Sequence, residues 1–282
     1  MLDIEFEWFD PQEVDFHGIK TLLKQLFDAD HELMDCSGLS DLVISQPKLG
    51  STVKVSDEVN TDAKNNDPFA FLTVLNLHAH LSKPPVQSLT SYLSSVASQI
   101  PSLASTLPSI LSSNDAQVGL VLTERFINMP AEIVPPMYTM LLEEIQWALD
   151  ENEPYKFTHY LVLSKTYTEV ISKLGDGEGG TIVHEDDDDD APKKKKQKGK
   201  KGGAATTEVT GETFYFHPED EVLHRFAAGY GDFAYRKEAA EGASDAKRAF
   251  YEAGVKPMGH MILLEAGKFQ EAVEAVKTYL GG

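Results

Sequence analysis

The residues that carry reactive side chains are scattered along the 282-residue chain, and few of them have the spacing of a chemical site. His78 and His80 are two residues apart at the end of an expected strand, so they would point to one face, an arrangement that metals sometimes use. No second cluster of ligand residues accompanies them, and exposed or hydrogen-bonded histidines are the favoured interpretation. The acidic run at residues 186–190 lacks the alternation and the glycine of a calcium loop. We therefore predict no metal site.

The sequence supports neither nucleophilic catalysis nor phosphate binding. Cys36 is the only cysteine, so no internal disulfide can form, and we expect a small buried or half-buried hydrophobe in a protein of a reducing compartment. No Gly-x-Ser-x-Gly elbow is present. The glycines of residues 174–180 are followed by no Gly-Lys-Ser/Thr, and Gly229 and Gly231 lack the rest of a dinucleotide fingerprint. We predict no catalytic residues and no cofactor.

Acidity is the strongest feature of the composition, with a formal charge of −20. Without the acidic run at residues 185–190 and the lysines of residues 193–201, the remainder holds 39 acidic and 18 basic residues, a charge of −21. Such a charge repels nucleic-acid phosphates and attracts basic proteins, so we expect a basic protein partner and no direct binding of nucleic acid. A solvated acidic surface without a partner is the alternative. No stretch approaches the roughly 18 apolar residues that span a bilayer, and we expect a soluble protein without a membrane partner.

A lysine cluster lies in a segment of unusual composition. Residues 175–210 contain glycines, then the acidic run and then the lysines, with almost no large apolar residue to offset the entropy of ordering. We predict a disordered charged insertion within a single α/β domain that spans residues 1–282. An import receptor with acidic grooves can recognise such lysines, so we favour a nuclear-import signal over a solvated spacer and expect the protein in both nucleus and cytoplasm. The lysines are Lys193, Lys194, Lys195, Lys196, Lys198, Lys200 and Lys201.

The elements that would position a site are organised around residues 119–150. Residues 119–123 are a short apolar run without proline, typical of a buried central strand. Pro135 and Pro136 predict the start of a helix, because proline in the first turn loses only an amide that has no partner there. Apolar residues at three- and four-residue spacing give this helix one apolar face. They are Tyr138, Leu141, Leu142, Ile145, Ala148 and Leu149.

Further elements precede and follow this unit. Strands are expected at residues 2–9, 50–55, 69–77, 156–171, 213–216 and 259–264. Helices are expected at residues 16–30, 38–45, in pieces within 86–113, at 219–228 and at 269–280, with Ser37 or Ser40 as the cap of the second. The pattern indicates a mixed α/β fold, a central twisted sheet flanked by helices.

Several blocks of the chain resemble one family. The block GLVLTERFINMPAEIVPPMY at residues 119–138 is similar to the BCCIP family of eukaryotes, which includes the fungal Bcp proteins, and its ERFINMP portion is the specific part. The register extends to FHGIKTLLKQLF, GSTVKV, FAFLTVLNL, THYLVLSKTY and FYFHPEDEVL, so the resemblance covers nearly the whole chain. It implies a fold like that of the GNAT acetyltransferases without the acetyl-coenzyme A site.

The resemblance also implies partners and a role. Fungal members are associated with escorting the universal large-subunit ribosomal protein numbered fourteen and with nuclear export of a phosphatidylinositol phosphate kinase. Animal members bind a recombination tumour suppressor and a cyclin-dependent kinase inhibitor. We therefore expect a non-enzymatic chaperone or adaptor in ribosome biogenesis and nuclear transport. A degenerate acetyltransferase and a scaffold for cell-cycle or recombination proteins are the alternatives.

The loop after the central strand supports the non-enzymatic interpretation. In GNAT enzymes the loop at this point has a sequence similar to Gln/Arg-x-x-Gly-x-Gly/Ala, and its backbone amides hold a pyrophosphate. Residues 125–136 contain no glycine and three prolines, which cannot donate, while Glu132 adds negative charge. Acidic residues toward the end of the following helix are the expected contacts of a basic client, with an ordinary solvated face as the alternative. They are Glu143, Glu144, Asp150, Glu151 and Glu153.

Overall fold

The strands of the computed structural model form one eight-stranded sheet, and the structure describes residues 5–46, 49–55, 67–169, 213–237 and 255–281. The sheet has the order β1-β2-β3-β4-β5-β8-β7, and β6 pairs with β5 outside this path. All pairs are antiparallel except β4 and β5. The strands are β1 Phe6–Phe9, β2 Ser51–Val55, β3 Ala70–Asn76, β4 Val118–Arg125, β5 His159–Glu169, β6 Thr213–Tyr215, β7 Ala227–Phe233 and β8 Val255–Glu265.

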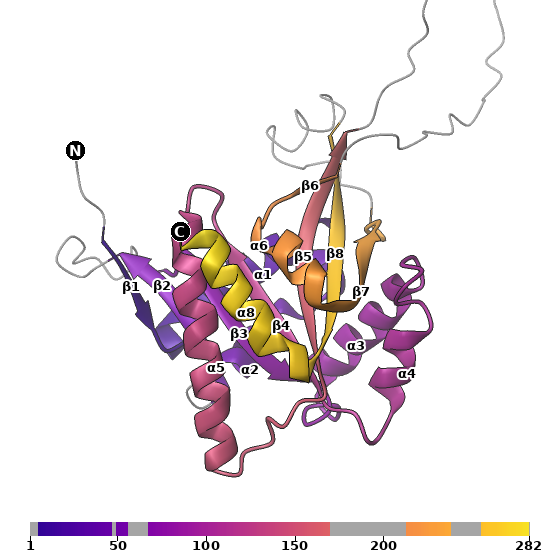
Figure 1. Ribbon diagram of the computed structural model, residues 1–282, viewed down its shortest axis with the longest axis horizontal. Coiled ribbons are helices and arrows are strands. Elements are labelled where there is room, and N and C mark those ends of the chain that lie inside the picture. Colours follow the sequence, from indigo (N-terminus) through magenta and orange to yellow (C-terminus); the bar gives the residue numbers. More distant parts are fainter. Residues whose placement is uncertain (1–4, 47–48, 56–66, 170–212, 238–254, 282) are drawn as a thin grey trace, which may run out of the picture.

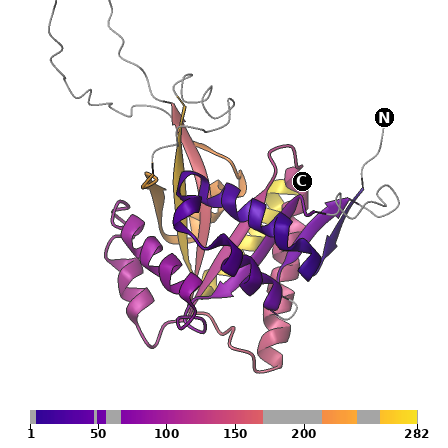
Figure 2. The same ribbon diagram turned by 180° about the vertical axis from the view of Figure 1, so that it is seen from behind.

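Helices cover both faces of the sheet (Figures 1 and 2). One face carries α1 Phe16–Phe27, α2 Cys36–Ser45, α3 Pro84–Ala97 and α4 Thr106–Ser112. The other carries α5 Val134–Asp150, α6 Glu219–Leu223 and α8 Ala266–Leu280. Short 3-10 helices η1 Glu13–Asp15, η2 Asp28–Leu33, η4 Ala131–Ile133 and η5 His224–Phe226 join some of these elements. Among the described helices, none is long and apolar enough to cross a membrane.

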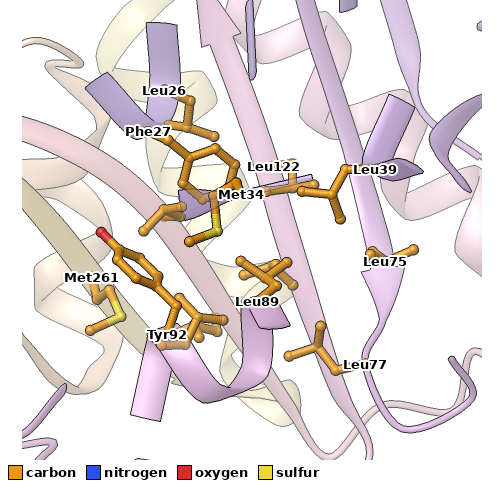
Figure 3. Close-up of a cluster of buried hydrophobic side chains, with 14 of the residues drawn as sticks. Leu26, Phe27, Met34, Leu39, Leu75, Leu77, Leu89, Tyr92, Leu122 and Met261 are labelled. Carbon is orange, nitrogen blue, oxygen red and sulfur yellow. The ribbon is translucent and has the colours of Figure 1, made fainter. Parts of the chain in front are cut away.

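Two apolar cores lie on the two faces of the sheet. Figure 3 shows part of the first, where Leu26 and Phe27 of α1 and Tyr92 of α3 lie with Leu122 of β4 and Met261 of β8. The second core packs α5 and α8 against alternate residues of the same strands, as expected for side chains that alternate across a strand. Because β4 is buried along its whole length on both faces, its sequence is almost continuously apolar until Thr123.

Most of the expected elements are confirmed. The helix after Pro135 and Pro136 is α5, which carries both prolines in its first turn, and the central strand is β4. Helix α2 corrects the expected cap: the carboxylate of Asp35, rather than a hydroxyl of Ser37 or Ser40, accepts the amide of Gly38 at 2.9 Å. Ser40 instead donates to the carbonyl of Cys36 at 2.7 Å, so its hydroxyl is used within the helix. Cys36 is buried, and burial raises the pKa of its thiol.

Strand β7 was not predicted from the sequence. Its segment AAGYGDF contains Gly229 and Gly231, which lower strand propensity. Packing explains the two glycines: a Cβ at Gly229 would lie 2.9 Å from Leu103, and one at Gly231 would lie 2.8 Å from Ile100. The segment between α3 and α4 therefore lies directly on the backbone of β7. The predicted helix at residues 219–228 is correspondingly shorter and is divided between α6 and η5.

These observations show a mixed α/β fold with a multi-stranded sheet flanked by helices, as the sequence predicts. The charged insertion at residues 175–210 lies outside the described residues.

Candidate functional site

The parallel strands β4 and β5 diverge at their carboxyl ends. They pair from Val118 with His159 to Leu122 with Leu163, and β4 then continues to Arg125 without pairing to β5. The edge of β5 that β4 leaves is taken by β6, which pairs with Thr166–Thr168. A gap in the sheet therefore lies between the end of β4 and β6.

A cavity of about 790 Å³ occupies this gap. Apolar side chains come from the loop after β4, from β5, from the segment after β6 and from β8; they are Phe126, Ile127, Met129, Tyr167, Phe216 and Pro257. Its polar lining includes Glu124, Arg125, Asn128, Lys165 and His217. The volume is that of a typical ligand pocket, and apolar walls with a few polar groups are typical of binding sites.

The free edge of β4 in this gap is already hydrogen-bonded. The amide of Arg125 donates to the carboxylate of its neighbour Glu124 at 3.0 Å. The carbonyl of Arg125 accepts the side-chain amide of Gln25 at 2.9 Å. An extended ligand that added to this edge as a further strand would have to displace both side chains, so the edge is protected against strand addition.

Buried ion pairs form the floor of the cavity. Arg125 donates both terminal nitrogens to the carboxylate of Glu219, at 2.5 and 3.0 Å. Lys165 lies 2.6 Å from Glu124, and His217 approaches the other oxygen of that carboxylate at 3.3 Å. Burial opposes ionisation of Glu124, but the charge of Lys165 and the hydrogen bond to His217 outweigh it and lower the pKa of Glu124 to about 2. The floor is therefore charged but internally compensated.

Ser164, His217 and Glu124 form an array that resembles a serine-histidine-acid triad. The hydroxyl of Ser164 lies 3.0 Å from Nδ1 of His217, whose Nε2 faces Glu124. Ser164 is only 1% exposed, however, and its hydroxyl donates to the carboxylate of Asp220 at 2.6 Å. Since both ring nitrogens of His217 are engaged and the hydroxyl does not reach solvent, this array is a structural hydrogen-bond network rather than a nucleophile.

A second polar network connects Asp232, His260 and His224. Asp232 accepts a hydrogen bond from Thr166 at 2.9 Å and lies 2.6 Å from Nδ1 of His260. Nε2 of His260 lies 2.8 Å from Nε2 of His224. Burial and the nearby His260 lower the pKa of His224 to about 4, so His224 is neutral at physiological pH. In the described part of the chain, no three or more His, Cys, Asp or Glu side chains are grouped to hold a metal.

The predicted client contacts are not all on the surface. Glu143, Asp150, Glu151 and Glu153 are exposed at the carboxyl end of α5, which projects beyond the sheet (Figure 1). Trp147, on the same end of the helix, is 59% exposed. Glu144 differs, because it is buried and accepts the amide of Gly50 at 2.6 Å. Glu144 therefore holds the start of β2 and does not belong to the exposed group.

The remaining predicted residues separate into two groups. The seven lysines of residues 193–201 and the acidic run at 185–190 lie outside the described residues. His78 and His80 lie in the turn after β3 rather than on a strand, and Nδ1 of His78 accepts the amide of Val118 at 3.2 Å. The floor residues of the cavity were missed by the sequence analysis. Their signal is the appearance of charge inside apolar strands, at Glu124 and Arg125 in β4 and at Lys165 in β5.

Glu144 predicts a pH dependence of stability. Burial raises its pKa from 4.5 to about 7, although the hydrogen bond from Gly50 opposes the rise. Because the folded state holds this proton more tightly, the contribution of Glu144 is complete below pH 4.5 and is lost as the pH rises through about 7. We expect Glu144→Gln to remove this loss, so that the wild type loses about 2 kcal/mol relative to the variant between about pH 5 and 7. Urea unfolding at a series of pH values measures the difference.

Glu151→Gln is the control, since Glu151 is an exposed acid directly after the same helix. Its pH profile should run parallel to that of the wild type. Burial also raises the pKa of Asp220, but that group is present in all three proteins and cancels in the comparison. A parallel profile for Glu144→Gln as well would contradict the interpretation.

Comparisons with known proteins find similarity along nearly the whole chain. The BCCIP family model matches residues 1–223. Protein bcp1 of Emericella nidulans is 52% identical over 280 residues, which cover 99% of this chain and 88% of that protein. Protein bcp1 of Schizosaccharomyces pombe is 44% identical over 275 residues, covering 96% and 88% of the two chains. The crystal structure of BCP1 from Saccharomyces cerevisiae superposes with a TM-score of 0.61 at 23% identity, covering 99% of this chain and 92% of that one, and supports the fold.

Proposed function

The chain belongs to the BCCIP family, and from that premise we propose that it is an acidic chaperone or adaptor that binds a basic ribosomal protein. The proposed client is the universal large-subunit ribosomal protein fourteen. Binding would shield the client from nonspecific RNA until it is delivered, which is a role in ribosome biogenesis. The family identity supports the coarser conclusion, a non-enzymatic role of the chaperone kind.

The observation that carries the proposal is the negative charge of the chain, −21 outside the two charged runs. Several exposed carboxylates lie toward the carboxyl end of α5, on both sides of the exposed Trp147 in the sequence. Carboxylates attract lysine and arginine side chains over a distance, and an exposed indole binds such cations across its face. We propose that Glu143, Asp150, Glu151 and Glu153 contact the client together with Trp147.

Transport is the second part of the proposal. The lysines of residues 193–201 would bind an import receptor, and the protein would then move between cytoplasm and nucleus with its client. A phosphatidylinositol phosphate kinase is a further proposed cargo. Deletion of residues 193–201 tests the import step, since unchanged nuclear accumulation of the variant would remove it.

A degenerate acetyltransferase is the rival function. The diverging parallel strands and the following loop and helix are the features that favour a GNAT-like frame. Against a cofactor, the edge of β4 is hydrogen-bonded to side chains, and α5 has two prolines in its first turn, where a pyrophosphate would require amides. Calorimetry with acetyl-coenzyme A decides between the functions. Micromolar binding would favour the enzyme, whereas we expect no heat of binding.

Charge neutralisation should slow the association of the client. We expect a variant without the four exposed charges at the end of α5 to bind about tenfold more slowly at low salt, because electrostatic steering sets the association rate. The difference should shrink as salt rises, since screening shortens the reach of the charges. Stopped-flow or biosensor kinetics at several salt concentrations measures it. The substitutions are Glu143→Gln, Asp150→Asn, Glu151→Gln and Glu153→Gln.

The control variant carries the same change of net charge on exposed residues of other elements. Its substitutions are Glu7→Gln, Asp41→Asn, Asp115→Asn and Glu274→Gln. If the exposed charges of α5 act through local contacts, the control variant should slow the association of the client less. Equal slowing of both variants would mean that total charge, rather than the end of α5, attracts the client.

A further inference from the structure

The cavity between β4 and β6 has an apolar rim that is exposed to solvent. Ile127, in the loop after β4, lines the cavity and is 88% exposed. Phe216, directly after β6, lines the opposite side and is 37% exposed. These are two of the few large apolar side chains that the described surface leaves in water, and both belong to the same opening.

The interior favours an apolar occupant. The charged groups of the floor are paired with one another, Arg125 with Glu219 and Lys165 with Glu124, so none requires a counter-charge from a ligand. Breaking either pair to bind a charged ligand would leave a buried charge uncompensated. The ring of Phe216 also covers the ammonium group of Lys165, whose Nζ lies 5.1 Å from the ring centroid. An apolar side chain can fill the space without disturbing these contacts.

The charge of the surroundings restricts the occupant further. An anionic ligand would approach a chain of formal charge −20, and Glu132 is exposed next to Ala131 at the cavity. A segment that carries lysine or arginine beside its apolar side chain is attracted by the same charge. A small molecule seated inside the cavity would leave Ile127 in water, whereas a polypeptide lying across the opening would cover it. The occupant that satisfies all three conditions is a basic polypeptide segment with a bulky apolar residue.

We propose that this cavity anchors the basic client by one bulky apolar side chain, with the flanking segment of the client lying over Ile127 and Phe216. The proposal rests on the proposed function and adds a division of labour to it. The acidic surface attracts the client and sets the rate of association. The cavity holds the bound client and sets the rate of dissociation, because burial of an apolar side chain is insensitive to moderate salt.

The test compares dissociation rates of the purified ribosomal client from variants of the full chain. Ile127→Asn removes the most exposed apolar side chain of the rim. Because this side chain is 88% exposed, the substitution should not prevent folding. Leu81→Asn is the matched control, an exposed apolar residue outside the cavity. We expect Ile127→Asn to raise the dissociation rate about tenfold at both low and high salt with an unchanged association rate. Leu81→Asn should leave both rates within about twofold of the wild type.

A second variant fills the cavity instead of trimming its rim. Ala131→Phe adds a ring to a half-buried position of the lining, and thermal unfolding checks that the variant is folded. We expect it to raise the dissociation rate as Ile127→Asn does. If both variants dissociate like the wild type while the four-charge variant still associates slowly, the anchor is wrong and the acidic chaperone stands. If the wild type does not bind the client at all, the proposed function and the anchor both fall.

Discussion

Replacement of Arg125 by methionine is expected to lower the free energy of unfolding by about 3–5 kcal/mol. Arg125 forms an ion pair with the carboxylate of Glu219. This carboxylate is 1% exposed and accepts two hydrogen bonds from the guanidinium. Burial opposes ionisation of Glu219, and the nearby His217 and Arg125 together lower its pKa. Without Arg125 the carboxylate must either remain charged without its main partner or take up a proton. Equilibrium unfolding in urea measures the cost.

The reason for so large an effect is desolvation rather than the strength of the pair itself. A buried ion pair is worth little compared with apolar side chains of the same volume, but the loss of one partner leaves the other with the full cost of its burial. The double variant Arg125→Met/Glu219→Met should therefore recover most of the loss. Non-additivity of this kind is the signature of two groups in direct contact.

An exposed ion pair provides the control. Lys237 lies 2.6 Å from Glu32, close to the 2.5 Å between Arg125 and Glu219, but the two side chains are 40% and 59% exposed. Lys237→Met should cost far less than Arg125→Met, because water screens the pair and solvates the partner that remains. Equal losses for Arg125→Met and Lys237→Met would show that burial does not set the cost.

The sheet and most helices could be predicted because their signals are local. Apolar runs mark β3, β4 and β5, prolines mark the start of α5, and three- and four-residue spacing marks its buried face. Glu144 could also have been placed correctly. It lies three residues after Leu141 and four before Ala148, both of which are buried, so it belongs to the apolar face. The assignment of Glu144 to the client surface used charge and neglected this spacing.

The cavity and strand β7 could not be predicted, because each depends on contacts between distant parts of the chain. Arg125 is 94 residues from Glu219 in the sequence, and nothing local shows that an arginine at the end of a strand will be buried. Strand β7 has two glycines where strand-forming residues are expected, and the reason is the segment near Ile100 and Leu103 that packs on its backbone. In both cases tertiary packing overrides local propensity.

The divergence of β4 and β5 also bears on the proposed division between the charged surface and the cavity. Where two parallel strands diverge, a sheet offers an open edge and a space, and β4 has its open edge occupied by Glu124 and Gln25. The space remains, but the buried charges Arg125 and Lys165 at its floor are paired with Glu219 and Glu124, which favours recognition through shape and apolar contact. In the proposed mode of binding, recognition of the basic client in the cavity is therefore separate from the charged surface that would attract it.

Gly259→Ala is the second substitution for which we expect a large effect, a loss of about 3 kcal/mol in the free energy of unfolding. Gly259 lies in β8 opposite Phe233 of β7, and a Cβ on Gly259 would lie 2.1 Å from the end of the Phe233 ring. The ring is 1% exposed and packs edge to face with Tyr92 and Tyr235, so it has no free space into which to move. Thermal or urea unfolding measures the loss.

Two further variants separate a steric clash from a general intolerance of alanine. Gly267→Ala, in the first turn of α8, adds a Cβ that meets nothing within 4 Å and should stabilise the protein by up to about 1 kcal/mol, as alanine does in helices. Phe233→Leu should cost less in the Gly259→Ala background than in the wild type, because the smaller side chain relieves the overlap while it leaves a void. Additive losses for these two changes would mean that Phe233 is not what excludes a side chain at position 259.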